Sequence, residues 1–310
     1  MALLENIRVF VRVVELGSFS AAGRFLRLSP AVVSHRIQQL EAHVGVRLLN
    51  RTTRQVQPTE QGMLYYEACL EVQRAVEQAE TSVAGAGAAP RGTLKVTAPL
   101  VFGRRILAPL IPEFQAATPN VEVQLRMSDH LLDLIKEGVD AAVRLSVPTD
   151  SSLVIRKIAD CPRILCAAPS YLAAHGEPAT PDDLLDHNCL LLRFPGSTQY
   201  QWVLNGPAGQ TTHSVRGRLD ADDSDVLTQW AVAGQGIAMK PVWEIADHLR
   251  EGRLKPVLPE FPPEPLTLGI LYPHRRLLPA KVRAFADFLV ERVSPAMEKM
   301  TKGAVLPAAE

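Results

Sequence analysis

The side chains best suited to a specific chemical task lie on one face of a helix that we predict from Pro30 to about Val44. That face carries small residues and neutral hydrogen-bonding residues, including Gln39 at its edge, whereas solvated helix faces usually mix lysine and glutamate. Glutamine pairs bidentately with adenine, histidine donates to the acceptors of guanine, and small side chains let a helix enter the major groove deeply. We therefore predict that this helix reads DNA; the alternative is an ordinary solvated face. The residues expected to contact DNA there are Ser29, Pro30, Ala31, Ser34, His35 and Gln38.

A short arginine-rich segment follows this helix. Residues 47–57 are rich in Arg, Thr and Val and poor in helix formers, which predicts a two-stranded wing. Arg51 and Arg54 flank two threonines at or near its tip. Because arginine suits phosphates and a narrow minor groove, we expect both residues to contact the DNA backbone. A solvated charge cluster, or an ion pair with Glu60, is the alternative.

The distribution of charge supports this interpretation. The first sixty residues contain eight arginines, no lysine and four glutamates, although the formal net charge of the whole chain is zero. The rest of the chain is therefore acidic. A short basic segment joined to an acidic body indicates binding of nucleic acid, confined to that segment.

No pattern in the sequence predicts catalysis or a cofactor. The sequence has no GxSxG, P-loop or HExxH, and no GxGxxG after a predicted strand. The four cysteines form no CxxC pair and lack zinc spacing, so we expect reduced, mostly buried thiols; redox sensing is the alternative. Ser29 and His35 are not expected to act as nucleophile and base, since both belong to the basic helical segment. We therefore expect no enzyme activity, no metal and no cofactor.

These side chains require a set of short helices to position them. An amphipathic stripe over residues 3–14 predicts a first helix, which Gly17 ends. Ser18 and Ser29 are natural N-caps for a second and a third helix, and proline follows Ser29 where its missing N–H does no harm. A longer helical pattern over residues 59–83 cannot bury its apolar stripe alone, so we expect a partner helix.

The remaining chain alternates β-rich and helical patterns, which predicts an α/β domain; its length suits two linked lobes with a cleft between them. The predicted strands are Leu94–Ala98, Val121–Met127, Val139–Leu145, Ile164–Ala168, Leu190–Leu192, His213–Leu219 and Leu266–Leu271. The predicted helices are Arg104–Ala116, Leu131–Glu137, Ser224–Ala233, Val242–Arg250 and Ala280–Val293.

These elements divide the chain into three parts. Residues 1–59 are expected to form an all-α winged helix-turn-helix for DNA binding. Residues 60–90 form a long linker helix for dimerisation and a flexible Ala/Gly hinge. Residues 91–310 form the α/β domain, which we expect to bind an effector. Its lobe I is placed at about 91–163 and 265–302, and its lobe II at about 164–264.

Polar side chains gather where the first strands of this domain end. Ligands of open α/β domains sit beyond the carboxyl ends of strands. The ends of three predicted strands, at residues 97–99, 127–128 and 144–146, supply the hydroxyls of Thr97, Ser128 and Ser146. A helix starting near Gly103 would point free N–H groups toward the same place. The expected ligand-binding residues are Thr97, Pro99, Val101, Ser128, Arg144 and Ser146.

Arg144 is the only cation in that set, so we expect the ligand to be a small organic anion or a polar aromatic molecule. The alternative is that Arg144 pairs with a carboxylate, such as Asp140 or Asp160, and that the hydroxyls only cap turns.

The motifs, taken in order, resemble the LysR-type transcription regulators. The resemblance is carried by FVRVVELGSFSAA (residues 10–22), LSPAVVS (28–34), IQQLE (37–41), RLLNRTTR (47–54) and PTEQG (58–62). Later segments are similar to the effector domain of one large branch of that family: TAPLVFGRR (97–105), HNCL (187–190) and AGQGIA (233–238).

The resemblance implies a C-terminal fold like that of periplasmic type 2 binding proteins. It also implies homodimers through the linker helix, commonly tetramers, and double-stranded operators with interrupted two-fold symmetry. Many members have Gln-Pro where this chain has Pro30-Ala31, and many have Arg where it has His35. Operator preference is therefore not carried over from a relative.

The chain lacks a run of about 20 apolar residues and a secretory signal, so we expect a cytoplasmic protein. The leading hypothesis is a DNA-binding regulator controlled by a small molecule. The alternatives are a constitutive regulator with a vestigial cleft, an enzyme fused to a DNA-binding head, and a binding protein of a transport system.

Overall fold

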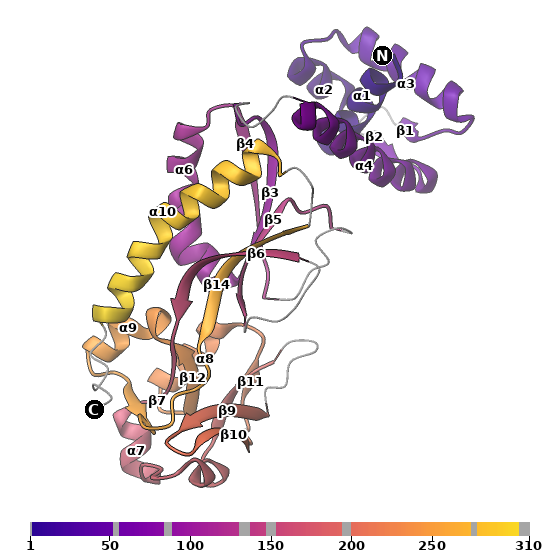
Figure 1. The fold of residues 1–310 in the computed structure, drawn as a ribbon. Coiled ribbons are helices and arrows are strands. Elements are labelled where there is room, and N and C mark those ends of the chain that lie inside the picture. Colours follow the sequence, from indigo (N-terminus) through magenta and orange to yellow (C-terminus); the bar gives the residue numbers. More distant parts are fainter. Residues whose placement is uncertain are drawn as a thin grey trace. The chain divides into compact units, whose positions relative to one another are not determined.

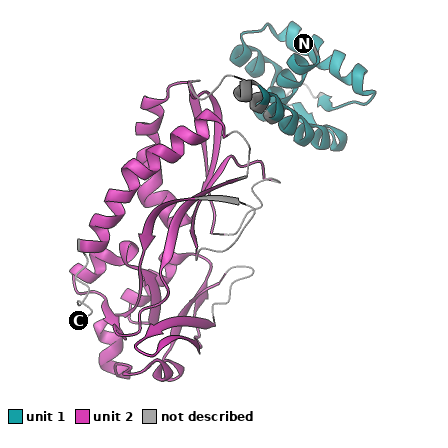
Figure 2. Ribbon diagram, viewed as in Figure 1, with its two compact units in different colours: residues 1–88 teal, residues 89–310 magenta. Residues whose placement is uncertain are grey.

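The computed structural model describes residues 2–51, 56–83, 89–129, 137–146, 153–193, 200–273 and 278–303. The chain divides into two compact units, Met1–Ala88 and Ala89–Glu310 (Figure 2). No helix in these ranges is long and apolar enough to cross a lipid bilayer.

The first unit is a helical domain with a β-hairpin (Figure 1). Its elements are α1 (Ala2–Leu16), α2 (Phe19–Leu26), α3 (Pro30–Val44), β1 (Leu49–Arg51), β2 (Val56–Pro58) and α4 (Glu60–Val83). Both predicted N-caps are confirmed, because Ser18 Oγ accepts from Ala21 N and Ser29 Oγ from Val32 N, each at 3.3 Å. Gly45 ends α3 with a φ of 76°, in the left-handed region that favours glycine. Helix, turn and capped helix are present as predicted.

Glu41 ties α3 to the hairpin. Its Oε1 accepts hydrogen bonds from Leu48 N at 2.9 Å and Leu49 N at 3.1 Å. At the same end of the hairpin, directly after β2, Thr59 Oγ1 donates to Arg47 O at 2.8 Å. A Cβ on Gly62 would lie 1.9 Å from Leu48 O, so only glycine allows α4 to approach the hairpin this closely. These contacts give a physical reason for the glutamate, threonine and glycine of the IQQLE and PTEQG segments.

The second unit contains two five-stranded sheets. The first sheet has the order β4-β3-β5-β14-β6, in which β3 runs parallel to β4 and β5, while β14 runs antiparallel to β5 and β6. Its strands are β3 (Gly92–Ala98), β4 (Val121–Met127), β5 (Ala141–Ser146), β6 (Leu153–Cys161) and β14 (Leu266–Pro273). The second sheet has the order β11-β8-β12-β7-β13. Its strands are β7 (Arg163–Ala167), β8 (Cys189–Leu192), β11 (Asp220–Ala221), β12 (Ile237–Pro241) and β13 (Lys255–Val257).

Helices cover both sheets. After β3 the chain continues through α5 (Leu100–Phe102), the π-helical turn η1 (Gly103–Leu107) and α6 (Ala108–Ala117). Packed on the first sheet, α6 and α10 (Ala280–Gly303) bring Phe114 and Phe285 edge to face, with ring centroids 5.2 Å apart (Figure 1). The second sheet is accompanied by α7 (Pro169–His175), the 3₁₀ turn η2 (Pro181–Asp186), α8 (Ser224–Val232), α9 (Val242–Arg250) and the hairpin β9 (Gln201–Gly206) with β10 (Gly209–Ser214).

The second sheet is buried on both faces. Along β7, Leu165 and Ala167 pack with Tyr171 of α7, whereas Cys166 between them packs with Leu227 of α8. This is the two-residue alternation of a strand. Because both faces are covered, β7 has apolar residues at successive positions and lacks the apolar–polar alternation of a strand with one exposed face.

Asn188 joins three segments of this sheet. Its Oδ1 accepts from Arg218 N at 2.8 Å, and its Nδ2 donates to Gln235 O at 2.6 Å. A Cβ on Gly236 would lie 2.2 Å from Asn188 O. The HNCL and AGQGIA segments are therefore structural, because they hold β8, β11 and β12 together.

Most sequence-predicted elements are confirmed, and the exceptions are specific. Val121–Met127 and Val242–Arg250 are a strand and a helix with the predicted bounds. The predicted strand His213–Leu219 is wrong: the chain forms the β9–β10 hairpin, which ends at Ser214. Strands β6, β9, β11, β12 and β13 and helix α7 were not predicted. The predicted helix Leu131–Glu137 falls almost wholly outside the described residues.

Candidate DNA-binding face and effector site

The structure places the predicted residues of α3 together on one exposed face. Ser29, Pro30, Ala31, His35 and Gln38 are exposed, and Ser34 is half-buried. On the opposite face Val33, Ile37 and Leu40 are fully buried against the other helices. The small and neutral side chains of this face are thus available to an incoming macromolecule.

His35 is held by its neighbour one turn along. Gln39 Nε2 lies 3.1 Å from His35 Nε2, and Gln39 Oε1 accepts from Nδ2 of the buried Asn6 at 3.4 Å. Sequence reasoning placed Gln39 only at the edge of the face and did not include Asn6.

The wing is present, but its tip lies outside the described residues. Arg51 ends β1 and pairs with Val56 across the hairpin. Nothing is described of the Arg51 side chain or of Arg54. Their contact with phosphate, and the alternative pairing with Glu60, therefore remain predictions.

Other arginines of the first unit fall into two groups. Arg8 and Arg36 contact Glu5 at 3.2 and 3.7 Å, and Arg12 contacts Glu15 at 3.0 Å. By contrast, three exposed arginines form no ion pair with any described residue: Arg24, Arg27 and Arg47. Sequence reasoning counted these three in the basic charge but did not single them out as phosphate ligands.

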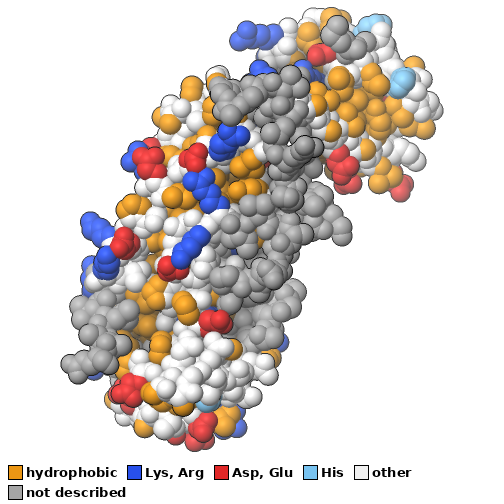
Figure 3. All heavy atoms as spheres, in the orientation of Figure 1, with side chains coloured by type: hydrophobic (Ala, Val, Ile, Leu, Met, Phe, Trp, Pro, Cys, Tyr) orange, Lys and Arg blue, Asp and Glu red, His pale blue; other side chains and the backbone are white. Residues whose placement is uncertain are grey.

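Many large apolar side chains of the first unit are exposed. Among the described residues, this unit carries most of the large exposed hydrophobic side chains: Leu3, Leu4, Leu16, Phe25, Val32, Val46, Met63, Leu64 and Val72. Figure 3 shows hydrophobic side chains gathered on the visible face of this unit. On α4, Leu64, Ala68, Val72 and Ala75 are all exposed, so the predicted stripe finds no cover among the described residues of its own chain.

In the second unit the strand order brings the predicted effector residues close together. Because β3 lies between β4 and β5, Thr97 pairs with Arg126 on one side and with Ala142 on the other. Arg144 Nη2 donates to Thr97 Oγ1 at 3.1 Å, and Arg144 Nη1 donates to Val143 O at 2.8 Å. Both side chains are buried. Burial lowers the pKa of Arg144 to about 10, so the guanidinium remains charged at neutral pH.

The other predicted residues differ in their exposure. Pro99, Ser128 and Ser146 are half-buried, and Ser128 N donates to Ala98 O at 2.9 Å. Val101 is 4% exposed and belongs to the core of the first sheet. Val101 therefore packs in the core, whereas the four polar side chains lie near the strand ends.

One detail of this region was predicted wrongly, and one alternative is not found. The helix starts at Leu100 and not near Gly103, and Leu100 N donates to Asp129 Oδ1 at 2.9 Å. A carboxylate of the protein thus occupies the first free N–H that was expected to face an anion. The alternative, in which Arg144 pairs with Asp140 or Asp160, is not found: Asp140 contacts Lys281 at 3.2 Å and Asp160 contacts Lys157 at 2.7 Å.

Asp129 is the functional candidate that sequence reasoning missed. Burial raises the pKa of its carboxyl group. Its Oδ2 is buried and has no hydrogen-bond partner among the described residues. A half-buried carboxylate next to Ser128, with Arg144 as an electrostatic neighbour, makes this region both cationic and anionic.

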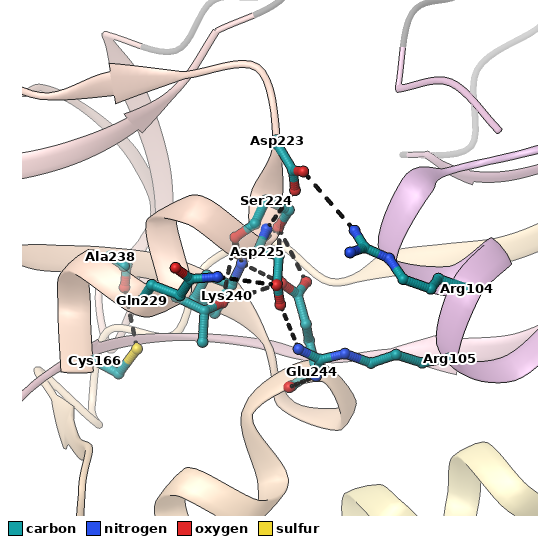
Figure 4. Close-up of polar contacts among 11 residues, drawn as sticks. Arg104, Arg105, Cys166, Asp223, Ser224, Asp225, Gln229, Ala238, Lys240 and Glu244 are labelled. Atoms are coloured by element: carbon teal, nitrogen blue, oxygen red, sulfur yellow. Dashed lines mark hydrogen bonds and ion pairs between the residues drawn. The ribbon is translucent and has the colours of Figure 1, made fainter. Parts of the chain in front are cut away.

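A polar cluster links η1, which follows strand β3 of the first sheet, to the start of α8, which packs on the second sheet (Figure 4). Arg105 donates to Asp225 and, at 3.0 Å, to Glu244 O, while Arg104 lies 3.9 Å from Asp223. These arginines belong to η1, and both aspartates lie at the start of α8. The last two residues of the TAPLVFGRR segment therefore bridge the two halves of the unit.

A buried ion pair adjoins this bridge and shares Glu244 with it. Lys240 is fully buried and contacts Glu244, which is 4% exposed. Lys240 Nζ donates to Ser224 O at 2.6 Å, and the hydroxyls of Ser224 and Thr228 donate to Glu244 at 3.0 and 3.2 Å. The only signal in the sequence is a lysine inside an apolar run, four residues before a glutamate.

The four cysteines are free and buried, as expected. Burial raises the pKa of Cys161, Cys166 and Cys189 to about 12 and also raises that of Cys69. Since the thiolate is the reactive form, these cysteines are poorly suited to redox sensing in this structure. No cluster of metal-ligating side chains occurs within the described ranges.

Comparison with known proteins agrees with the helix-turn-helix of the first unit and the two sheets of the second. A model of the bacterial regulatory helix-turn-helix protein, lysR family, matches residues 4–63, and one of the LysR substrate binding domain matches residues 87–294. The chain belongs to the LysR family of transcriptional regulators.

Similar proteins extend over nearly the whole chain. An uncharacterized HTH-type transcriptional regulator of Haemophilus influenzae is 36% identical over 282 residues, 91% of this chain and 98% of the relative. The regulator DmlR of Escherichia coli is 35% identical over 289 residues, 93% of this chain and 94% of the relative. The full-length structure of the Vibrio cholerae virulence activator AphB is 30% identical, with a TM-score of 0.59, and the match covers 93% of this chain and 98% of that one.

The protein is therefore a DNA-binding transcriptional regulator with an effector-binding domain, in a family of regulators and not of enzymes. Regulators of this family bind DNA and small-molecule effectors and form oligomers.

Proposed function

We propose that the exposed face of α3 reads the bases of a two-fold operator, with His35 and Gln38 at its centre. The observation that carries this proposal is the pairing of a fully buried apolar face with an exposed face of small and neutral polar side chains. Ser29, Pro30, Ala31 and Ser34 surround the two readers, and Arg51 and Arg54 contact phosphates. Because the operator lies in the bacterial cytoplasm, the protein acts there.

Base reading makes a prediction that distinguishes it from general attraction to DNA. His35→Ala or Gln38→Ala should weaken binding to the specific operator by about 1–3 kcal/mol, because a base edge loses its hydrogen-bond partner. Binding to an unrelated duplex at the same salt concentration should not change. Fluorescence anisotropy with both duplexes measures this, and an equal loss on both would show that these residues only position the protein.

The proposed organisation assigns residues 1–59 to DNA binding, 60–90 to the linker helix and hinge, and 91–310 to the effector domain. Lobe I would comprise about 91–163 and 265–302, and lobe II about 164–264. The two separate five-stranded sheets support this division. The α4 helices would pair two copies, and two dimers would form a tetramer.

We further propose that the effector binds where β3, β4 and β5 end, beside Thr97, Pro99, Ser128, Arg144 and Ser146. Val101 would support the site from the core. A small organic anion or polar aromatic molecule would take over the Arg144 donor that now bonds Thr97. Asp129 Oδ2, which no described residue engages, would accept a hydroxyl or amine of the same molecule.

Calorimetry with candidate organic acids tests this site. Thr97→Val and Ser128→Ala should weaken effector binding about tenfold each, since each removes one hydrogen bond. Operator affinity without effector should stay at the wild-type value. Undiminished effector binding in both variants would place the site elsewhere.

A further inference from the structure

A polar relay runs from the interior of the first unit to the face that we propose reads DNA. Asn6 on α1 is 7% exposed, and its Nδ2 donates to Gln39 Oε1 on α3 at 3.4 Å. Gln39 Nε2 lies 3.1 Å from His35 Nε2. Since α1 and α3 pack against each other, the relay joins a buried amide to an exposed imidazole.

The chemistry of the relay determines where the proton of His35 lies. The nitrogen of a primary amide only donates hydrogen bonds. His35 Nε2 must therefore accept and carries no proton. A neutral imidazole has one N–H, so the proton is on Nδ1.

We propose that Asn6 and Gln39 are positioning residues that hold His35 as the neutral Nδ1–H tautomer. His35 makes no other hydrogen bond to a described residue, so Nδ1–H is free to donate to a base. This proposal rests on the proposed role of His35 in base reading. It specifies that role: His35 reads an acceptor, such as N7 or O6 of guanine or N7 of adenine.

A substitution at Asn6 can reverse the donor and acceptor roles in the relay while every residue of the DNA-binding face keeps its identity. Asn6→Asp has no N–H, so Gln39 must turn its amide, directing Nε2 to residue 6 and Oε1 to His35. His35 then needs a proton on Nε2, and Nδ1 becomes an acceptor. An acceptor favours the amino groups of cytosine or adenine.

Solid-state ¹⁵N NMR of the full chain with ring-labelled histidine tests the tautomer directly, with His35→Gln identifying the signals. The measurement is made at pH 8.5, above the usual range of histidine pKa values. We expect Nδ1 protonated in the wild type and Nε2 protonated in Asn6→Asp. A wild-type His35 protonated on Nε2, or an unchanged pattern in Asn6→Asp, would overturn the proposal.

A second variant covers the case in which Asn6→Asp does not fold. In Gln39→Met the side chain offers no amide, so His35 should adopt the Nε2–H tautomer that an unconstrained neutral histidine side chain prefers in water. Retention of Nδ1–H in this variant would also overturn the proposal.

Selection of operators from random duplexes gives the functional readout. The wild type should select an acceptor-bearing purine at one position, and Asn6→Asp should reduce that preference by roughly tenfold and shift it toward an amino-bearing base. Asn6→Leu, the matched control, should weaken the preference without shifting it.

His35→Ala separates this proposal from the one on which it rests. If His35→Ala removes the preference but Asn6→Asp leaves it unchanged, the relay does not act on recognition. If His35→Ala changes no position, base reading by His35 is wrong, whichever tautomer NMR reports.

Discussion

At the scale of single residues, the proposed effector site combines a buried cation with a half-buried carboxylate. Arg144 donates to Thr97 and to a backbone carbonyl, whereas Asp129 has one oxygen bonded to Leu100 N and one without a partner among described residues. A buried carboxylate with an unsatisfied oxygen destabilises the fold. Such a cost is typical of a group that is kept for binding.

Asp129→Asn should therefore stabilise the protein at neutral pH. Burial raises the pKa of Asp129 in the folded state, so the stability provided by its protonated form is lost as pH rises through that value. Asparagine keeps an acceptor for Leu100 N and has no charge to bury. The melting temperature should rise by a few degrees at pH 7–8, and the two proteins should converge as the pH falls toward about 4.

Asp140→Asn is the matched control for that measurement. Asp140 accepts from Lys95 N at 3.0 Å and contacts Lys281 at 3.2 Å, so its charge is compensated. This variant should be less stable than the wild type at pH 7. A lower melting temperature for Asp129→Asn as well would show that the Asp129 charge is stabilising.

The two wing arginines make a separate prediction about ionic strength. If Arg51 and Arg54 contact phosphates, each Arg→Ala variant should weaken binding to all duplexes and reduce the slope of log K against log salt by roughly one. Arg250→Ala, which removes an ion pair on α9, should leave the slope unchanged. A loss of affinity with the wild-type slope would exclude direct phosphate contact.

At the scale of elements, the sequence predicts the features that depend on residues close together in the chain. Helix caps at Ser18 and Ser29 and the apolar stripe of α3 are read within a few residues, and all are present. Strand β12 was missed because Lys240 interrupts its apolar run, and the lysine is buried only through partners on α8 and α9. The capping of Leu100 by Asp129 joins residues 29 positions apart, so no local pattern could predict it.

The Lys240–Glu244 pair makes a prediction about these elements. Lys240→Met leaves Glu244 charged and buried without its cation, which should cost about 3–5 kcal/mol of unfolding free energy. Lys240→Met with Glu244→Gln should recover most of that loss. Urea unfolding measures both, and Lys302→Met, which breaks an exposed pair with Glu298, should cost less than about 1 kcal/mol. Equal losses in the single and double variants would mean that packing, and not charge, is what matters.

At the scale of the whole molecule, two copies of α3 must be presented together if the operator is two-fold. The first unit provides a surface for this, because the stripe of α4 is exposed along Leu64, Ala68, Val72 and Ala75. Apolar stripes of this length are stable in water only when another helix covers them. The proposed pairing with the same helix of a second copy would satisfy that need and would set the spacing of the two DNA-binding domains.

Leu64→Glu should therefore dissociate the protein, since Leu64 is 65% exposed within one chain and would be covered in the dimer. Sedimentation velocity of the full chain should show a smaller species at micromolar concentration. Operator affinity should fall at least tenfold, because one head then binds one half-site. Leu185→Glu, at a 47% exposed leucine of the second unit, is the matched control and should change neither quantity. An unchanged sedimentation coefficient for Leu64→Glu would show that copies associate through another surface.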